Sequence, residues 1–298
     1  MSSIYDIEKE IKYLVEPRDD GKELKTVAAA TLGLTRRQIS SAKFRRDGLT
    51  LDGKRAYAAD KVRAGQLLII RLREDGTIYR PRPHAGDVDI IYEDEDLYVI
   101  DKCAPLPTQS SERQTGDTLE ARLLPRLEGR AFRPVNRLDK GTSGLMLVAK
   151  HVLSQSHLQE QLHTPGFIRE YLAVVEGYME RDEGIVDAPI EKADGPTIRR
   201  EVRPDGKEAR TRFRTLRRSN GLSLVRLRLD TGRTHQIRVH MSYLGHPVFG
   251  DFMYGTESER LPGRFALHSA YVSFAHPTDG RIMEFSSPLP PELERLMD

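Results

Sequence analysis

The chain mixes many short runs of β-forming residues with a few helical patterns, in no regular order. From residue 87 onward the β-rich runs are Val88–Tyr92, Leu97–Asp101, Leu145–Lys150, Tyr171–Glu176, Arg210–Leu216, Leu222–Leu229 and Phe265–Phe274. Apolar residues with helical spacing fall in Thr118–Leu127, Val152–His163, His235–Leu244 and Pro291–Met297. A doubly wound fold needs strands and helices in alternation, so this order predicts an α+β domain with a mostly antiparallel sheet.

The first 86 residues form a separate, smaller pattern. Its expected elements are a strand at Ile11–Val15, helices at Leu24–Leu32 and Arg36–Phe44, a hairpin around Leu49–Leu51 and a strand at Leu67–Leu72. Gly33 ends the first helix, and Thr35 is a typical N-cap for the second. Residues 74–86 contain the prolines and glycines of a linker. We therefore predict two domains, residues 1–80 and 81–298.

Composition excludes several classes of protein. Hydrophobic residues make up 38% of the 298 and charged residues 31%, as in ordinary globular proteins. No apolar run approaches the roughly 18 residues that span a membrane, and the charged N-terminus lacks a secretory pattern. The single cysteine, Cys103, excludes an internal disulfide and a multi-cysteine zinc site. We expect a cytoplasmic monomer without membrane contact.

Charge is distributed unevenly along the chain. The net formal charge is only +2, but residues 1–86 carry a balance of +6 and the remainder a balance of −4. A basic module on a mildly acidic body suggests binding to a polyanion. On charge alone, a solvated charged face is an equally good interpretation.

The segment Arg137–Gly144 is the most informative stretch. Its one carboxylate, Asp139, lies between Arg137 and Lys140 in a turn rich in Gly, Ser and Thr, just before the apolar run Leu145–Val148. Such a loop would hold Asp139 at the entrance of a strand, where a cleft could form. Without further information, a surface Asp in an Asx turn is the more ordinary interpretation.

Four segments in order along the chain resemble the RluA-type pseudouridine synthases. They are Arg137–Gly144, Arg169–Gly177, Leu227–Met241 (with Thr-Gly-Arg-Thr-His-Gln-Ile-Arg-Val-His) and Gly245–Asp251. The resemblance covers about residues 87–290. It implies the pseudouridine synthase fold, α+β with a mostly antiparallel mixed sheet and a central cleft.

The resemblance has three departures. Asn136 replaces the usual His, Arg169 replaces the usual Lys, and Cys103 replaces the usual Pro. They bear on the subfamily and the RNA target more than on the chemistry.

The basic module resembles the S4 RNA-binding domain over about residues 22–72. The resemblance rests on Leu34–Ile39, Phe44–Lys54 and Val62–Gln66, although Gly65-Gln66 stands where the family usually has Gly-Asp. Paired arginines on a short helix followed by a basic hairpin can follow a phosphate backbone. A charged appendage of other use remains the alternative. The RNA-binding candidates here are Arg36, Arg37, Lys43, Arg45 and Arg46.

The resemblance assigns roles in the larger domain. Asp139 would be the catalytic carboxylate, Tyr171 the aromatic residue against the target base, and Arg238 the salt-bridge partner of Asp139. Without the resemblance, Tyr171 would be an ordinary half-buried strand residue and Arg238 an exposed helix arginine. Asp139 would either attack the sugar or the uracil ring, or abstract a ribose proton.

Further residues are expected to contact the RNA or support the fold. Arg137 would contact phosphate or displace the target base from its stack. Arg233 and His235 are candidate RNA contacts, and His240 is expected to be structural or RNA-contacting. No Walker-type glycine loop or tight histidine cluster is present, so neither a metal nor another cofactor is expected.

The chain is therefore predicted to isomerise specific uridines to pseudouridine in structured RNA. Large-subunit ribosomal RNA is the favoured target, because S4-bearing members of the family tend to act there, and transfer RNA is the runner-up. A non-catalytic RNA-binding or ribosome-assembly factor on the same fold is the main alternative class. A glycosidase acting on RNA is a further alternative.

Overall fold

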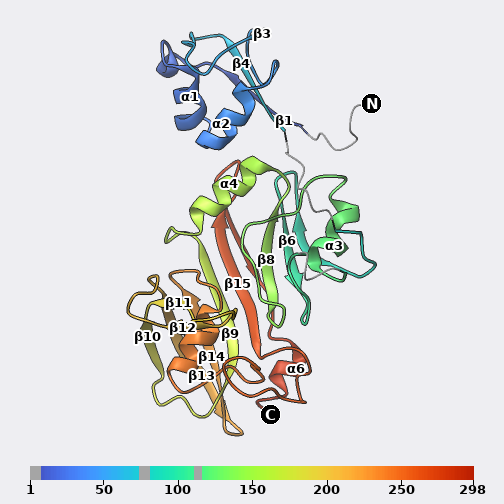
Figure 1. Ribbon diagram of the computed structural model, residues 1–298, viewed down its shortest axis with the longest axis vertical. Coiled ribbons are helices and arrows are strands. Elements are labelled where there is room, and N and C mark those ends of the chain that lie inside the picture. Colours follow the sequence, from blue (N-terminus) through green and yellow to red (C-terminus); the bar gives the residue numbers. More distant parts are fainter. Residues whose placement is uncertain (1–7, 74–80, 111–115) are drawn as a thin grey trace.

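The protein has two bodies with separate hydrophobic cores, stacked end to end (Figure 1). The computed structural model describes residues 8–73, 81–110 and 116–298. The expected boundary at residue 80 lies in 74–80, outside the described residues. Within the described ranges, no helix has the length and apolar character needed to cross a membrane.

The N-terminal body is a four-stranded antiparallel sheet with two helices. In sheet order its strands are β1 (Glu8–Leu14), β4 (Leu67–Arg73), β2 (Leu49–Leu51) and β3 (Lys54–Arg55). The helices are α1 (Leu24–Ala30) and α2 (Arg36–Lys43), with a short 3₁₀ helix, η1 (Pro17–Asp19), before them. A capping box between Thr35 and Gln38 starts α2, as the N-cap pattern predicts. The β2–β3 hairpin turns at Asp52-Gly53, where both residues have positive φ.

The larger body is built on one ten-stranded sheet. Its main path runs β10 (Glu183–Asp187), β13 (Arg210–Ser219), β14 (Leu222–Leu229), β9 (Ile168–Glu176), β15 (Leu267–Ala275), β8 (Ser143–Ala149), β6 (Leu97–Lys102) and β5 (Asp89–Glu93). β16 (Ile282–Ser286) pairs with β15, and β7 (Arg133–Pro134) pairs with β8. The β8–β15 pair is parallel and all other pairs of this sheet are antiparallel. The predicted fold class, α+β with a mostly antiparallel mixed sheet, is confirmed.

Few helices accompany this sheet. They are α3 (Leu119–Leu123), followed by the 3₁₀ helix η2 (Leu124–Arg126), then α4 (Val152–Gln161), α5 (Gln236–Tyr243) and α6 (Pro291–Glu294). β11 (Ile190–Lys192) and β12 (Arg200–Val202) form a separate two-stranded sheet. Five further strands, β7, β10, β11, β12 and β16, are not predicted from the sequence. These strands have two to five residues, and most are partly exposed, so they lack the apolar runs by which the longer strands were found.

Strand β8 lies in the middle of the sheet. It is buried at every position, and it pairs with β15 on one side and β6 on the other. A strand that is buried on both faces needs a continuous apolar run, as in Leu145–Val148. The Asp139 loop enters the sheet directly before β8, so the most buried strand anchors that loop.

Helix α4 connects the two bodies (Figure 1). Val152 and Leu153, in its first turn, pack against the N-terminal core. Nε2 of Gln38, in α2, donates a hydrogen bond to the carbonyl oxygen of Val152 at 3.3 Å. Gln159 and Leu162, at the other end of α4, line a cleft in the larger body. One short helix therefore contacts both the N-terminal body and the cleft.

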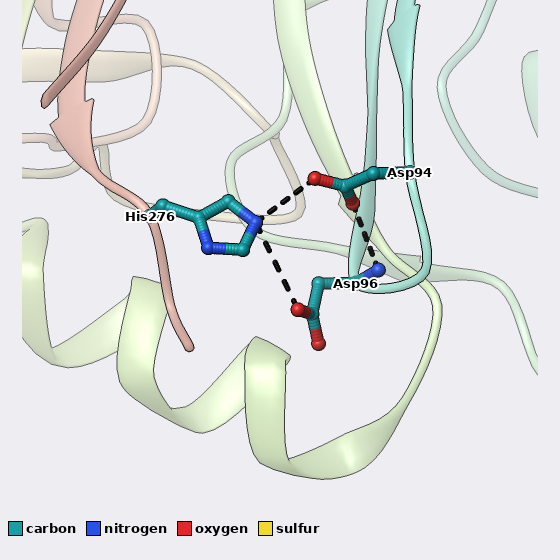
Figure 2. Close-up of side chains that lie close together, drawn as sticks. All are labelled: Asp94, Asp96 and His276. Atoms are coloured by element: carbon teal, nitrogen blue, oxygen red, sulfur yellow. Dashed lines mark hydrogen bonds and ion pairs between the residues drawn. The ribbon is translucent and has the colours of Figure 1, made fainter. Parts of the chain in front are cut away.

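Asp94, Asp96 and His276 meet beside α4 (Figure 2). Nε2 of His276 donates to Oδ2 of Asp94 at 2.9 Å, and Oδ1 of Asp94 accepts the backbone N–H of Asp96 at 2.8 Å. Asp96 accepts hydrogen bonds from Ser154 at 2.8 Å and Thr278 at 2.6 Å. The groups are close enough to hold a metal ion, but both carboxylates already accept hydrogen bonds from protein donors. They form a network that joins the β5–β6 turn, the β15–β16 turn and the start of α4.

Replacement of Asp96 tests this network. Asp96→Ala leaves the Ser154 and Thr278 hydroxyls without their carboxylate acceptor, so we expect a loss of about 2–4 kcal/mol in the free energy of unfolding. Glu95→Ala, at an exposed position in the β5–β6 turn, should cost less than about 1 kcal/mol. Urea denaturation of the two variants measures the difference. Equal losses would mean that the network does not support this end of the sheet.

Candidate active site

Asp139 lies in a loop that hydrogen bonds hold in place. The hydroxyl of Thr108 donates to the carbonyl oxygen of Leu138 at 2.7 Å, and the N–H of Leu106 donates to that of Lys140 at 2.9 Å. A Cβ on Gly141 would lie 2.7 Å from the ring of Phe265, so glycine lets that ring pack against the loop. The Asp139 side chain remains 30% exposed. The loop is fixed while its carboxylate faces the cleft.

Arg238, in the first turn of α5, binds two carboxylates at once. Its Nη1 lies 2.9 Å from Oδ2 of Asp139. Its Nε and Nη2 lie 2.6 Å and 2.8 Å from the two oxygens of Asp251. Arg238 is 3% exposed and the Asp251 side chain 0%. The ion pair expected between Arg238 and Asp139 is present, and a buried fork to Asp251 fixes the direction of the guanidinium.

Aromatic rings enclose the Arg238 guanidinium. Its carbon lies 4.2 Å from the ring centre of Phe265 and 5.0 Å from that of Tyr254. Phe265 therefore contacts both Gly141 of the Asp139 loop and Arg238. Cations over ring faces are attracted by the ring quadrupole, more strongly where water is excluded. One ring thus sets the loop and the arginine relative to each other.

Tyr171 faces the same space from strand β9. It pairs with Leu227 of β14 and Ser269 of β15, and it is 6% exposed. Burial raises the pKa of Tyr171, so its side chain is a neutral phenol at physiological pH. Asp139 precedes β8, two strands from β9 in the sheet. At about 4.8 Å per strand spacing, this order brings the two residues to one cleft.

The cleft comprises two adjoining parts that share Asp139 and Tyr171, a larger one that we call the outer part and a smaller one that we call the inner pocket. The outer part, of about 510 Å³, is lined by Asp139, Tyr171 and Arg169 among others. The inner pocket, of about 70 Å³, is lined by Asp139, Tyr171 and Arg238. The structure therefore brings together all three residues that the sequence marked as catalytic.

Three residues expected to contact RNA also line the cleft. Arg137 is exposed there, and Nε of Arg233 donates to the carbonyl oxygen of Glu208 at 2.9 Å. Nε2 of His235 lies 3.9 Å from Oδ1 of Asp139, and its Nδ1 is 2.8 Å from the Tyr254 hydroxyl. Burial lowers the pKa of His235, which is therefore neutral at pH 7.

The other expected RNA contacts lie away from this site. Arg36, Lys43 and Arg46 are exposed in the N-terminal body, where Arg45 is half-buried. Arg37 lies in helix α2 beside Arg36, but the structure does not describe its side chain.

Comparison with known proteins identifies the family. The family model described as RNA pseudouridylate synthase matches residues 96–243. The RNA pseudouridine synthase YjbO of Bacillus subtilis is 37% identical over 273 residues, which are 90% of this chain and 96% of that protein. The chain belongs to the RluA-type RNA pseudouridine synthases.

Two further relatives agree with this assignment. The ribosomal large subunit pseudouridine synthase D of Xanthomonas campestris is 37% identical, over 83% of this chain and 79% of its own. The solved structure of human RNA pseudouridylate synthase domain containing 1 has 29% identity and a TM-score of 0.57, with coverage of 68% of this chain and 83% of that one. The chain is therefore an RNA pseudouridine synthase with an RNA substrate.

Part of this synthase's site is not predicted from the sequence. Asp251 was seen only as the end of a motif, and Tyr254 and Phe265 were assigned no role. An acidic residue in an apolar segment was the available signal for Asp251, because a buried carboxylate needs a cation. His240 is structural: its two ring nitrogens lie within hydrogen-bond distance of Thr211 and of the Ala188 carbonyl.

Replacing Asp251 should damage both the fold and the site. In Asp251→Asn the buried Arg238 loses the buried one of its two carboxylate partners, so we expect a loss of about 3 kcal/mol in the free energy of unfolding. The rate of pseudouridine formation should fall as well, because the guanidinium is no longer held toward Asp139. Urea denaturation and single-turnover kinetics measure the two effects.

Asp230→Asn is the matched control for Asp251→Asn. Asp230 pairs with Arg212 at the surface, so its replacement should cost less than about 1 kcal/mol and leave the rate unchanged. An Asp251→Asn enzyme with the stability and rate of this control would contradict the anchoring role.

Proposed function

We propose that this synthase converts uridines of large-subunit ribosomal RNA to pseudouridine, with Asp139 as its catalytic carboxylate. The observation that carries the catalytic assignment is the position of Asp139. One of its oxygens is held by the buried Arg238, while the side chain faces a cleft whose inner pocket also contains Tyr171. A reaction that breaks one bond to C1′ and forms another there needs a fixed carboxylate beside an aromatic platform.

The reaction exchanges two bonds at C1′ of the ribose. The N1–C1′ bond breaks, the uracil turns, the C5–C1′ bond forms, and the proton on C5 leaves as N1 gains one. In one route Asp139 attacks the sugar or the uracil ring and is released later, and in the other it abstracts a ribose proton while the base departs. Both routes require an ionised carboxylate, and Arg238 supplies the compensating charge.

Tyr171 and Arg137 are placed where they could contact the target base and its neighbours in the stack. Tyr171 would stack on the uracil, and its phenol would help to transfer the C5 proton to water in the cleft. Arg137 is exposed at the cleft, where it could enter the stack in place of the departing base. The inner pocket would then hold the uracil, with the ribose and phosphates in the outer cleft.

Relatives of known target class support the ribosomal substrate. The synthases named ribosomal large subunit pseudouridine synthase D from Xanthomonas campestris, Nitrosomonas europaea and Vibrio cholerae are 36–37% identical to this chain. Transfer RNA is the alternative target. Pseudouridine mapping in ribosomal and transfer RNA from cells with and without this gene tests the proposal. Loss of modification in transfer RNA alone would overturn it.

Asp139→Asn should abolish catalysis but not folding. The amide has the shape of the carboxylate but not its charge. Arg238 remains paired with Asp251 in this variant. We expect the single-turnover rate to fall by roughly 10³-fold or more, with RNA affinity and stability close to wild type. Asp230→Asn again serves as the control. Appreciable product from purified Asp139→Asn enzyme would exclude this residue as the catalytic group.

The N-terminal body would bind RNA in the manner of an S4 domain. The support is its basic helix α2, with Arg36, Lys43 and Arg46 exposed in or beside it. These side chains lie outside the cleft, so they would add affinity without taking part in the chemistry.

Neutralising these three residues tests the proposed RNA-binding role. In the triple variant Arg36→Gln, Lys43→Gln, Arg46→Gln, the slope of log affinity against log salt concentration should flatten by roughly 2 to 2.7 units. The single-turnover rate at saturating RNA should remain unchanged.

A matched triple variant controls for total charge. Arg126→Gln, Arg281→Gln and Arg295→Gln remove three exposed charges from the larger body, and the salt slope should hardly change. Equal salt slopes for both triple variants and the wild type would contradict RNA binding by these three residues of the N-terminal body.

A further inference from the structure

Arg169 lies in the wall of the cleft as a buried cation without a hydrogen-bond or ion-pair partner among the residues that the structure describes. It is 8% exposed, and its Nε has no hydrogen-bond partner within the described part of the chain. Its guanidinium carbon lies 5.7 Å from the ring centre of Phe167. Neither a carboxylate nor a carbonyl oxygen of the described residues binds this guanidinium, which keeps its charge at any physiological pH.

The other two buried arginines are neutralised by carboxylates. Among the residues whose burial the structure describes, these are Arg238 and Arg264. Arg238 binds Asp139 and Asp251, and Arg264 binds Glu292 and the Ser143 hydroxyl. A buried charge without a partner is unfavourable, so an anion in the cleft beside Arg169 would be bound favourably.

Gly232 leaves room for this guanidinium. A Cβ on Gly232 would lie 2.9 Å from Nη1 of Arg169, although Gly232 does not have a positive φ. A side chain at this position would therefore force the Arg169 guanidinium to shift, whereas the backbone conformation of Gly232 itself sets no requirement for glycine. Gly232, Arg233 and Thr234 line the outer cleft together with Arg169.

The location of Arg169 indicates which part of the substrate it meets. Arg169 and Tyr171 are two residues apart on β9 and line the same cleft, so they lie about 6.6 Å apart along the strand. Tyr171 also lines the inner pocket, whereas Arg169 lines only the outer part. With the uracil in the inner pocket, Arg169 faces the backbone of the RNA. The anions that RNA carries there are phosphates.

We propose that Arg169 binds a phosphodiester next to the target uridine, and that this phosphate neutralises the buried guanidinium. The proposal rests on the proposed function, because it takes the inner pocket as the uracil site. Arg169 is then a substrate-binding residue distinct from the arginine that holds Asp139. A fork-shaped guanidinium can bind two phosphate oxygens, which would fix the ribose relative to the Asp139 carboxylate.

The test combines Arg169 variants with an RNA that lacks single backbone charges. The substrate is a stem-loop with the uridine that pseudouridine mapping identifies, synthesised with one uncharged methylphosphonate linkage at each position around it. For the wild-type enzyme, one linkage adjacent to the uridine should weaken binding by about tenfold or more. Arg169→Met should bind the unmodified RNA about tenfold more weakly than the wild type does. The methylphosphonate at the same position should not weaken its binding further.

Three further measurements separate this role from a structural one. Arg169→Lys keeps a cation and should recover part of the affinity. In free Arg169→Met the melting temperature should be unchanged or higher, because an unpaired buried charge is removed. Gly232→Ala should weaken RNA binding and reduce the effect of the uncharged linkage, because its methyl group displaces the Arg169 guanidinium. Arg281→Met, which removes an exposed charge on the β15–β16 turn, should bind the RNA and respond to the linkage as wild type does.

The outcomes distinguish this proposal from the proposed function. If a target uridine is found but Arg169→Met still loses affinity at the same linkage, Arg169 does not bind that phosphate. A large fall in the melting temperature of Arg169→Met, without recovery in Arg169→Lys, would also overturn the proposal. If the target uridine lies in transfer RNA instead, the ribosomal assignment fails, and the same linkage experiment still tests Arg169.

Discussion

The buried fork between Arg238 and Asp251 determines the geometry of the active site. Two nitrogens of Arg238 are committed to Asp251, so the third points in one direction, toward Asp139. Each charge would be costly to bury alone, and their close hydrogen bonds offset that cost only if both are present. The fork thus needs the enclosed setting that Phe265 and Tyr254 supply. An exposed ion pair would hold the Asp139 carboxylate far less firmly.

The large sheet positions the segments that carry the residues of the active site. Strand β8 is buried throughout and carries the Asp139 loop at its start, while β9 carries Tyr171 two strands away. Phe265 packs against Gly141 and lies under Arg238, so it connects the loop to α5. A rigid scaffold of this kind keeps the reacting groups oriented before the substrate arrives, which lowers the entropic cost of the reaction.

Two buried arginines in the same cleft differ in how their charge is compensated. Arg238 is neutralised within the protein, so its position does not depend on the substrate. Arg169 has no such partner among the described residues, and it fits a site whose anion comes with the RNA. The two cations would then have different roles: Arg238 orients the Asp139 carboxylate, and Arg169 would bind the RNA backbone. The N-terminal body, joined to the cleft through α4, would add affinity from a distance.

The sequence alone predicted the longer local elements and the residues that we propose to be reactive. The capping pattern of Thr35 and Gln38, the apolar run Leu145–Val148 and the motif around Asp139 are local signals, and the structure has α2, β8 and the cleft where they occur. Tertiary structure decided the rest. Asp251 meets Arg238 only because α5 and the following loop fold against each other, and Gly232 meets Arg169 across 63 positions of the chain. Short exposed strands such as β10 form because a neighbouring strand offers backbone hydrogen bonds. Their own residues show no strand pattern that the sequence could reveal. Periodicity along a chain reports which face of an element is buried, whereas the partners of a buried charge depend on the order in which distant strands pack.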